Sequence, residues 1–150
     1  RYVDPSLFRH DGKWWLFAED SPHRDDTLRL FYADQIDGEW TEHPESPVIK
    51  NDSLSARPAG RVINYKGRIF RYVQHDDPVR GENVRVFEIT KLTTTAYEQK
   101  EYHGSPILEA SGKGWTQKGM HHVDPHQLSE NEWIACVDAE GKHLLFGFGY

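Results

Sequence analysis

The chain has 150 residues, a formal net charge of −6, 37% apolar residues and 13% aromatic residues. This length accommodates one domain with a hydrophobic core, and the aromatic content sets the composition apart from that of a disordered chain. The negative charge argues against nucleic acid as a partner, because a phosphate backbone requires a basic face. No run of about 18 apolar residues occurs, so no membrane span is predicted.

Cys136 is the only cysteine, which excludes an intrachain disulfide and leaves the redox compartment open. The chain begins at Arg1, with neither Met nor a signal peptide, two residues before an expected strand. We therefore expect a soluble chain of undetermined localisation, and its abrupt start suggests either a segment cut for expression or a fragment of something larger.

The first expected element is a β-hairpin over residues 3–19. Val3–His10 alternates apolar and polar residues, Asp11-Gly12 is a strong hairpin turn, and an aromatic strand follows. Further strands are expected at 28–34 and, after Asp37-Gly38, at 39–43. A Pro-rich crossing at 43–49 then leads to the next part of the chain.

This order of elements recurs along the sequence. A second unit has strands at 58–63 and 68–73 around Lys66-Gly67, and a third has strands at 124–128 and 133–138. Equivalent landmarks of the first two units lie 53 to 59 positions apart. The nearest approach to a helical segment, residues 91–100, contains three consecutive Thr and no apolar stripe. Strands at 84–87 and 97–102 complete the second unit, and Leu144–Phe148 is the third expected strand of the last.

Repeated units of four short antiparallel strands are typical of β-propeller blades. We expect an all-β fold with one partial propeller domain over residues 1–150. Two complete four-stranded blades, at approximately 1–49 and 50–108, precede most of a third at 109–150. Propellers typically close with four or more blades. The chain is therefore either part of a larger propeller or a unit that closes one by self-association; a small open sandwich is less compatible with the repeat.

In a propeller the first strand of each blade lines the central channel. The unit starts would bring Asp4, Arg57 and the run that contains His121, His122 and Asp124 around one axial pocket, where ligands usually bind. As a carboxylate, Asp4 is suited to act as a general base or to accept hydrogen bonds from sugar hydroxyls. The alternative is that the Asp-Pro pair only marks the start of a strand. Arg57 is either a polar clamp beside that carboxylate or a solvated loop residue.

Two further features bear on this pocket. His122, Asp124 and His126 would share one face of a strand, which makes a metal site conceivable; however, Pro125 interrupts ideal strand geometry and no fourth ligand is indicated. We expect these side chains to bind backbone or ligand instead, with no metal and no other cofactor.

Trp115, in the glycine-rich loop 112–119, either stacks on a sugar face or fills a contact between blades. The other four tryptophans, Trp14, Trp15, Trp40 and Trp133, are expected in the core.

The order of four motifs resembles a known family. These are the Asp4-Pro5 hairpin with Trp14-Trp15-Leu16-Phe17, Ala56–Arg61, Leu108–Ser111, and His121-His122 followed by Gln127-Leu128. Together they resemble the propeller domain of glucosamine inositolphosphorylceramide transferases and their bacterial relatives, over nearly the whole chain. The resemblance implies that these are the C-terminal three of five blades. The Asp-Pro hairpin alone is more distantly similar to five-bladed propellers of family 43 and related glycoside hydrolases.

The resemblance implies sugar-related functions. In the transferases the transfer chemistry is ascribed to a separate glycosyltransferase domain, whereas the hydrolases use three axial carboxylates, of which only the base has a counterpart here, Asp4. The second acid that hydrolysis requires could be Glu19, Asp20, Glu109 or Asp138.

Three hypotheses follow. The chain is a carbohydrate-recognising module for a glycan or a sugar-containing small molecule, a family 43-type glycoside hydrolase with Asp4 as base, or a structural module that completes a propeller as a homo-oligomer.

Overall fold

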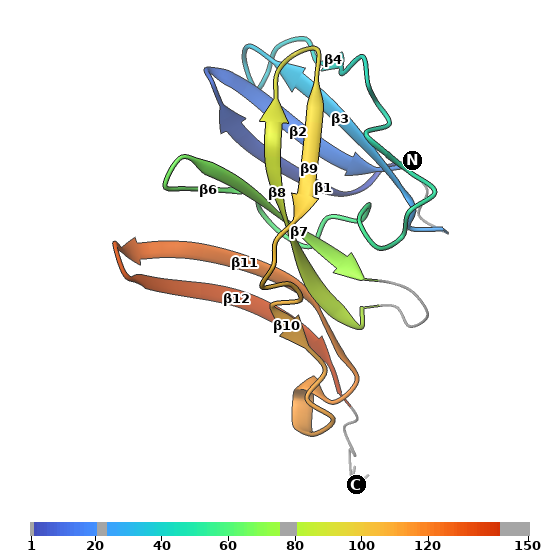
Figure 1. Ribbon diagram of the computed structural model, residues 1–150, viewed down its shortest axis with the longest axis vertical. Coiled ribbons are helices and arrows are strands. Elements are labelled where there is room, and N and C mark those ends of the chain that lie inside the picture. Colours follow the sequence, from blue (N-terminus) through green and yellow to red (C-terminus); the bar gives the residue numbers. More distant parts are fainter. Residues whose placement is uncertain (1, 21–23, 76–80, 142–150) are drawn as a thin grey trace, which may run out of the picture.

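The computed structural model describes residues 2–20, 24–75 and 81–141. Its first sheet, at the top of Figure 1, is antiparallel with the strand order β1-β2-β3-β4, and β5 pairs with the start of β3. The strands are β1 (Val3–His10), β2 (Lys13–Glu19), β3 (Thr27–Ala33), β4 (Thr41–Glu42) and β5 (Ile49–Lys50). The expected hairpin is confirmed: β1 and β2 join across Asp11-Gly12, both of which adopt positive φ as a tight hairpin turn requires.

The second sheet repeats this plan with the order β10-β8-β7-β6, and β9 pairs with β8. Its strands are β6 (Ile63–Tyr65), β7 (Arg68–His75), β8 (Asn83–Leu92), β9 (Tyr97–Glu101) and β10 (Leu108–Glu109). Each sheet thus has five strands rather than the expected four. The extra strands, β5 and β10, are two-residue segments at the end of each Pro-rich crossing, which pair back with the long third strand of their own sheet.

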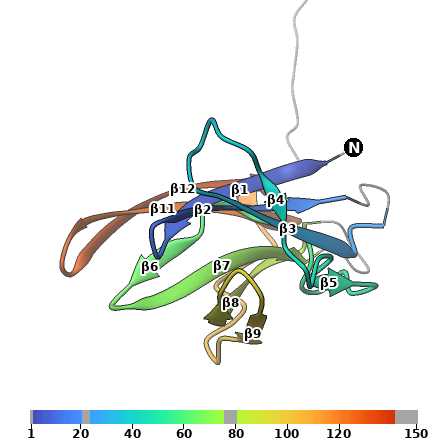
Figure 2. The same cartoon turned by 90° about the horizontal axis from the view of Figure 1, so that it is seen from above.

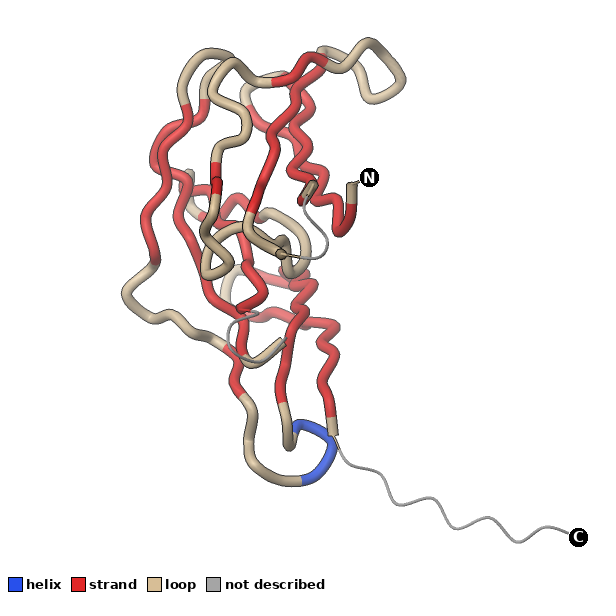
Figure 3. The backbone as a smooth tube through the Cα atoms, turned by 90° about the vertical axis from the view of Figure 1, so that its right-hand side faces the viewer, coloured by secondary structure: helices blue, strands red, loops and turns tan. Residues whose placement is uncertain are grey.

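The third unit is the long hairpin of β11 (Gly119–Ser129) and β12 (Glu132–Glu140), preceded by the 3-10 helix η1 (Gly114–Thr116). Figures 1 and 3 place this hairpin and η1 at the opposite end of the molecule from the first sheet. β11 begins five residues earlier than the sequence suggested. The expected strand at Leu144–Phe148 lies outside the described residues. Within the described ranges, no helix is long and apolar enough to cross a membrane.

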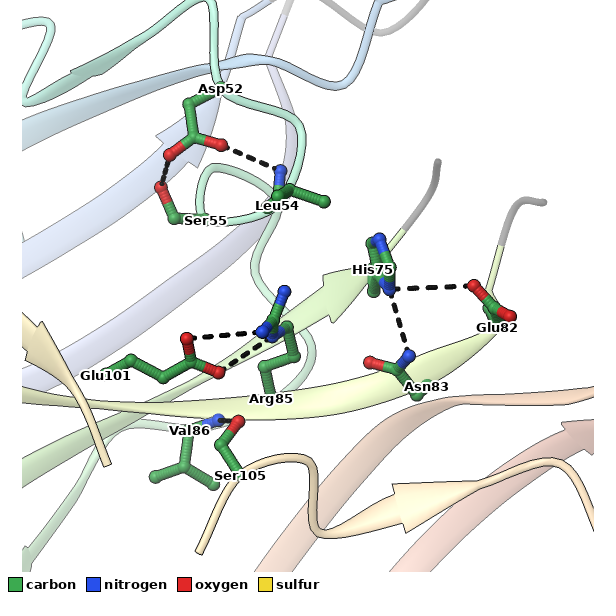
Figure 4. Close-up of polar contacts among 10 residues, drawn as sticks. All are labelled: Asp52, Leu54, Ser55, His75, Glu82, Asn83, Arg85, Val86, Glu101 and Ser105. Carbon is green, nitrogen blue, oxygen red and sulfur yellow. Dashed lines mark hydrogen bonds and ion pairs between the residues drawn. The ribbon is translucent and has the colours of Figure 1, made fainter. Parts of the chain in front are cut away.

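The first two units repeat each other down to single hydrogen bonds. The amide of Leu30 donates to Ser46 Oγ at 3.3 Å, and the amide of Val86 donates to Ser105 Oγ at 3.1 Å. Figure 4 shows the second of these contacts beside the Arg85–Glu101 ion pair that links β8 to β9. The carbonyls of Leu30 and Val86 likewise each accept from the backbone of the returning chain. A short polar side chain thus fastens each crossing to the third strand of its sheet.

The hydrophobic core lies between successive sheets, which Figure 2 shows from above. One cluster joins Phe8, Trp15, Phe17 and Leu30 of the first sheet to Ile69 and Ile89 of the second. The other joins Phe70, Tyr72 and Val86 of the second sheet to Val123 of β11. Face-to-face packing of consecutive antiparallel sheets is the arrangement of propeller blades.

The tryptophans divide between core and surface. Trp15 is buried as expected, and Trp14 and Trp40 are half-buried. Trp133 is 37% exposed, so its assignment to the core was wrong. Its ring packs edge to face on Tyr65, with centroids 5.6 Å apart, while much of the outer face of β12 stays open to solvent.

Candidate functional site

A cleft of about 580 Å³ lies where the beginnings of the three units meet. This volume falls in the range of small-molecule sites. Residues of β1, of the segment between β5 and β6, of β7 and of the β11–β12 hairpin line it. The polar side chains in its lining are Asp4, Ser6, Arg57, Arg61, Gln74, His121, His122, Asp124, Asp138 and Glu140.

Arg57 is the most buried charged group in the lining, with 8% of its side chain exposed. Its Nε donates to Asp4 Oδ2 at 2.7 Å, and its Nη1 donates to Asp25 Oδ1 at 2.8 Å. The backbone carbonyl of Arg57 also accepts a hydrogen bond from the backbone amide of Gln74, which fixes this segment against β7. The guanidinium is therefore a rigid bridge between two carboxylates.

Asp4 itself has a backbone φ of 48°, in the left-handed region that non-glycine residues seldom adopt. It lies at an irregularity in the β1–β2 pairing between Val3 and Ser6. Such bulges redirect a side chain at the edge of a site. The bulge turns the Asp4 carboxylate toward Arg57, with 40% of its side chain still exposed.

A second guanidinium, Arg61, forms a bidentate pair with Asp124 of β11. Arg61 Nη2 lies 2.8 Å from Asp124 Oδ2, and Arg61 Nε donates to the other carboxylate oxygen. The Arg61 hydrogen bonds hold the pKa of Asp124 below its usual range. Arg61 also contacts His126 Nδ1 at 3.4 Å. This pair joins the second unit to the third across the cleft.

Close backbone contacts set the width of the cleft. Gly60 has a φ of 135°, and a Cβ there would lie 1.8 Å from the carbonyl oxygen of Val123. The Val123 amide donates to the Ala59 carbonyl at 2.8 Å, and Ser6 Oγ donates to the Gly60 carbonyl. All three units therefore touch at Gly60, which only glycine permits.

On the far side of the cleft, β12 contributes Asp138 and Glu140. Asp138 Oδ2 lies 3.3 Å from His121 Nε2, and Glu140 Oε1 accepts from Lys118 Nζ at 2.7 Å. The Lys118 hydrogen bond lowers the pKa of Glu140. Both acids come from alternate positions of one strand and therefore from one of its faces.

The structure brings five of the sequence-derived candidates into the lining of this cleft: Asp4, Arg57, His121, His122 and Asp124. Trp115, in contrast, is not among the lining residues; its side chain is 53% exposed on η1. Sequence reasoning missed Arg61 and Gln74. Arg61 stands in the Ala56–Arg61 motif, but its partner lies 63 positions away.

The four acids considered as a partner for Asp4 are also separated. Asp138 lines the cleft, while Glu19 is buried in β2, Asp20 pairs with Arg29, and Glu109 is exposed on β10. Within the described residues, no three His, Cys, Asp or Glu side chains are grouped to hold a metal. Arg61 occupies both Asp124 oxygens, which removes that carboxylate from the conceivable His122-Asp124-His126 set.

Comparison with known proteins identifies the family that the sequence motifs resemble. Residues 1–140 match the family described as glucosamine inositolphosphorylceramide transferase 1, N-terminal. The chain belongs to this family. The glucosamine inositolphosphorylceramide transferase 1 of rice (Oryza sativa subsp. japonica) is 33% identical over 164 residues, which cover 97% of this chain and 21% of that protein. The Arabidopsis thaliana protein of the same name is 32% identical over 146 residues, 92% of this chain and 19% of that protein.

This member of the N-terminal family thus spans about a fifth of the length of its curated relatives. Among solved structures it is similar to Zg3597, a family 117 glycoside hydrolase from Zobellia galactanivorans. The TM-score is 0.61 at 18% identity, over 94% of this chain and 40% of that one. At this identity the likeness shows the fold alone. The expected resemblance to the transferase family and to glycoside hydrolase propellers is confirmed.

Proposed function

We propose that the chain is a carbohydrate-recognising propeller module whose ligand, a glycan or a sugar-containing small molecule, binds in the cleft between the three units. The observation that carries this proposal is the joint lining of one 580 Å³ cleft by Asp4, Arg57, His121, His122 and Asp124. Carboxylates, guanidinium groups and imidazoles in fixed positions are suited to the dense hydroxyl groups of a sugar ring. Pro5, Leu7 and Pro58 add apolar surface for its C–H faces.

The relatives support a sugar-related role, since both are named glucosamine inositolphosphorylceramide transferase 1. The remainder of such a longer protein would supply both the transfer chemistry and further propeller blades. The cleft would then bind the sugar-containing ligand, and the rest of the longer protein would carry out the transfer.

A glycan array followed by calorimetry tests the proposal. We expect binding without turnover, and about ten-fold or greater weakening in Asp4→Asn and Asp124→Asn. Asp37→Asn, in an exposed turn outside the cleft lining, is the matched control and should bind normally. Equal affinities of all three variants would place the ligand elsewhere.

A hydrolytic function is the second candidate. It is favoured by the fold shared with a family 117 glycoside hydrolase and by the presence of Asp4 and Asp138 in one cleft. With Asp4 as base, hydrolysis predicts release of reducing sugar that Asp4→Asn abolishes. Binding that persists without any such release rules this candidate out.

An assembly role is favoured by a different observation, the exposed apolar side chains of the third unit. Leu128 and Ile134 are 60% and 58% exposed, and Trp133 lies between them in sequence. Patches of this kind often mark protein contacts. A sharp oligomeric mass in sedimentation experiments, together with no affinity for any glycan, would favour this role over recognition.

A further inference from the structure

An apolar groove of about 420 Å³ lies between the second unit and the β11–β12 hairpin. It shares no lining residue with the polar cleft. Its walls are largely aromatic and include Phe70, Tyr72 and Tyr102 of the second unit and Trp133 of β12, which is 37% exposed. Apolar surface of this kind usually marks a contact with a further segment or with a partner.

The repeat identifies the surface of the first unit that corresponds to this groove. Phe17 of β2 lies opposite Leu30 of β3, just as Tyr72 of β7 lies opposite Val86 of β8. Tyr72 is therefore the counterpart of Phe17. Whatever covers Phe17 shows which element is expected over Tyr72.

Phe17 is covered by the second unit and is only 1% exposed. Tyr97 of β9 packs on its ring edge to face, with centroids 5.8 Å apart, and the Arg71 guanidinium lies 5.6 Å from its centroid. Arg71 in turn lies 5.5 Å from the ring centroid of Phe87 in β8. The third and fourth strands of the second unit thus complete the cover of the first.

Among the described residues, the sheet of the third unit consists of β11 and β12 alone. Ala135 is the counterpart of Arg71, because each lies three positions after the residue that begins its strand, Glu132 in β12 and Arg68 in β7. Arg71 is 2% exposed, whereas Ala135 is exposed and its methyl group is too short to replace a guanidinium over Tyr72.

The exposure of β12 as a whole points the same way. β7 pairs on both sides and has six consecutive buried residues. All nine residues of β12 are exposed or half-buried, and within the described structure this strand pairs only with β11. An open strand edge of this length is a template for a further strand.

The sequence that follows β12 suits this edge. Bulky apolar side chains occupy alternate positions, at Leu144, Phe146, Phe148 and Tyr150, whereas Gly147 and Gly149 lie between them. A strand with this alternation buries its bulky face. The order in 145–148 also follows that of 28–31 in β3 and 84–87 in β8, which gives Phe148 the position of Phe87.

We propose that residues 144–150 form a third strand along β12 and cover the groove, with Phe148 opposite Ala135 and its ring against Tyr72. The register follows from β7 and β8, in which Phe87 lies opposite Arg71. The phenyl ring fills the space that the short alanine leaves. Because β12 also lines the polar cleft, this strand would hold the far wall of that cleft in place.

Paired cysteines in a Cys136→Ser background test the register. Directly opposite residues of antiparallel strands have Cβ atoms about 4.5–5.5 Å apart, close to the separation in a disulfide. We expect Ala135→Cys combined with Phe148→Cys to form a disulfide within one chain, detected by mass spectrometry after oxidation. Ala135→Cys combined with Leu145→Cys, on the opposite face of the segment, is the matched control and should stay largely reduced.

Stability provides a second, independent readout. Phe148→Ala should lower the melting temperature by about 8 °C or more, because an aromatic ring leaves a packed groove. Leu145→Ala, on the opposite face, should lower it by about 2 °C or less. In a chain shortened after Gly141, the amides of β12 should exchange with deuterium at least about ten-fold faster than in the full chain.

Each contrary outcome names another occupant or none. A disulfide that joins two chains would assign the groove to a second copy, and equal linkage of both cysteine pairs would show that the segment has no fixed register. The proposal also fails if Phe148→Ala melts like the wild type and shortening leaves the exchange of β12 unchanged. A further blade of a longer protein would then be the expected cover.

Discussion

Arg57 donates from Nε to Asp4 Oδ2 at 2.7 Å, across 53 positions of the chain. The two residues are equivalent in consecutive units, since Asp4 precedes Pro5 and Arg57 precedes Pro58. The first unit thus presents a carboxylate where the second presents its counter-ion. The two opposite charges join the units at the edge of the cleft, and they also place a guanidinium against the carboxylate that a hydrolase would use as base.

Replacing Arg57 should cost stability as well as ligand affinity. Arg57→Met leaves Asp4 and Asp25 without this partner in a site where the guanidinium is nearly buried. We expect the free energy of unfolding to fall by about 2–4 kcal/mol in urea titrations. Arg85→Met, which breaks the more exposed pair with Glu101, should cost less than about 1 kcal/mol. Equal losses in the two variants would contradict a special role for Arg57.

The contact of Gly60 with Val123 predicts an unusually sensitive glycine. In Gly60→Ala the new methyl group would lie 1.8 Å from a carbonyl oxygen, so the second and third units must move apart. We expect a loss of about 3 kcal/mol or more in unfolding free energy, together with weaker sugar binding. Gly67→Ala is the control: its φ of 76° is also positive, but nothing lies within 4 Å of the added Cβ, and the change should cost only about 1 kcal/mol.

The architecture was largely predictable from the sequence, because strand alternation and the Asp-Gly and Lys-Gly turns are local signals. The return strands β5 and β10 were not, since two residues after a proline crossing show no alternation. The exposure of Trp133 was also missed. An aromatic residue in a strand does not reveal whether another sheet covers it.

The candidate site was only partly predictable. The repeat indicated that Asp4, Arg57 and the His121–Asp124 run lie at equivalent unit starts, and these residues do line one cleft. The ion-pair partners of these side chains could not be predicted from the repeat. Arg61 meets Asp124, and Arg57 meets Asp25, through contacts between units that leave no local pattern. The positive φ of Asp4 likewise depends on a bulge that the Asp-Pro pair does not specify.

Arg71 provides a third prediction, on the packing of the first sheet against the second. Its buried guanidinium lies 5.6 Å from the ring centroid of Phe17 and 5.5 Å from that of Phe87, and it donates to Gln99 Oε1 at 2.7 Å. Arg71 also donates to backbone carbonyls of the segment before Arg57. Burial lowers the pKa of this guanidinium.

Arg71→Met should therefore reduce the unfolding free energy by about 2–4 kcal/mol, because buried carbonyl groups lose their donor. Arg71→Lys should recover only part of the loss, since an ammonium group cannot reproduce the planar fork. Thermal and urea unfolding of the two variants provide the measurement. A methionine variant as stable as the wild type would show that the hydrogen bonds of Arg71 add nothing to stability.

The last prediction concerns acid stability and rests on Glu88. Arg68 forms two hydrogen bonds to this carboxylate, and Lys100 lies 3.3 Å from it. These contacts lower the pKa of Glu88 from an ordinary 4.5 to about 2. Because the folded-state pKa is depressed, the stabilisation is fully present above pH 4.5 and is lost as the pH falls from there through about 2.

Glu88→Gln should accordingly be less stable than the wild type at pH 6, and the difference should disappear near pH 2. Titration of the Glu88 carboxyl carbon by NMR should show the low pKa directly. In Arg68→Met the pKa should rise toward its ordinary value, and high salt should raise it in the wild type, because Arg68 is half-exposed and its charge is screened. A stability difference between wild type and Glu88→Gln that stays constant from pH 6 to pH 2 would show that the ion pair contributes nothing to the acid response.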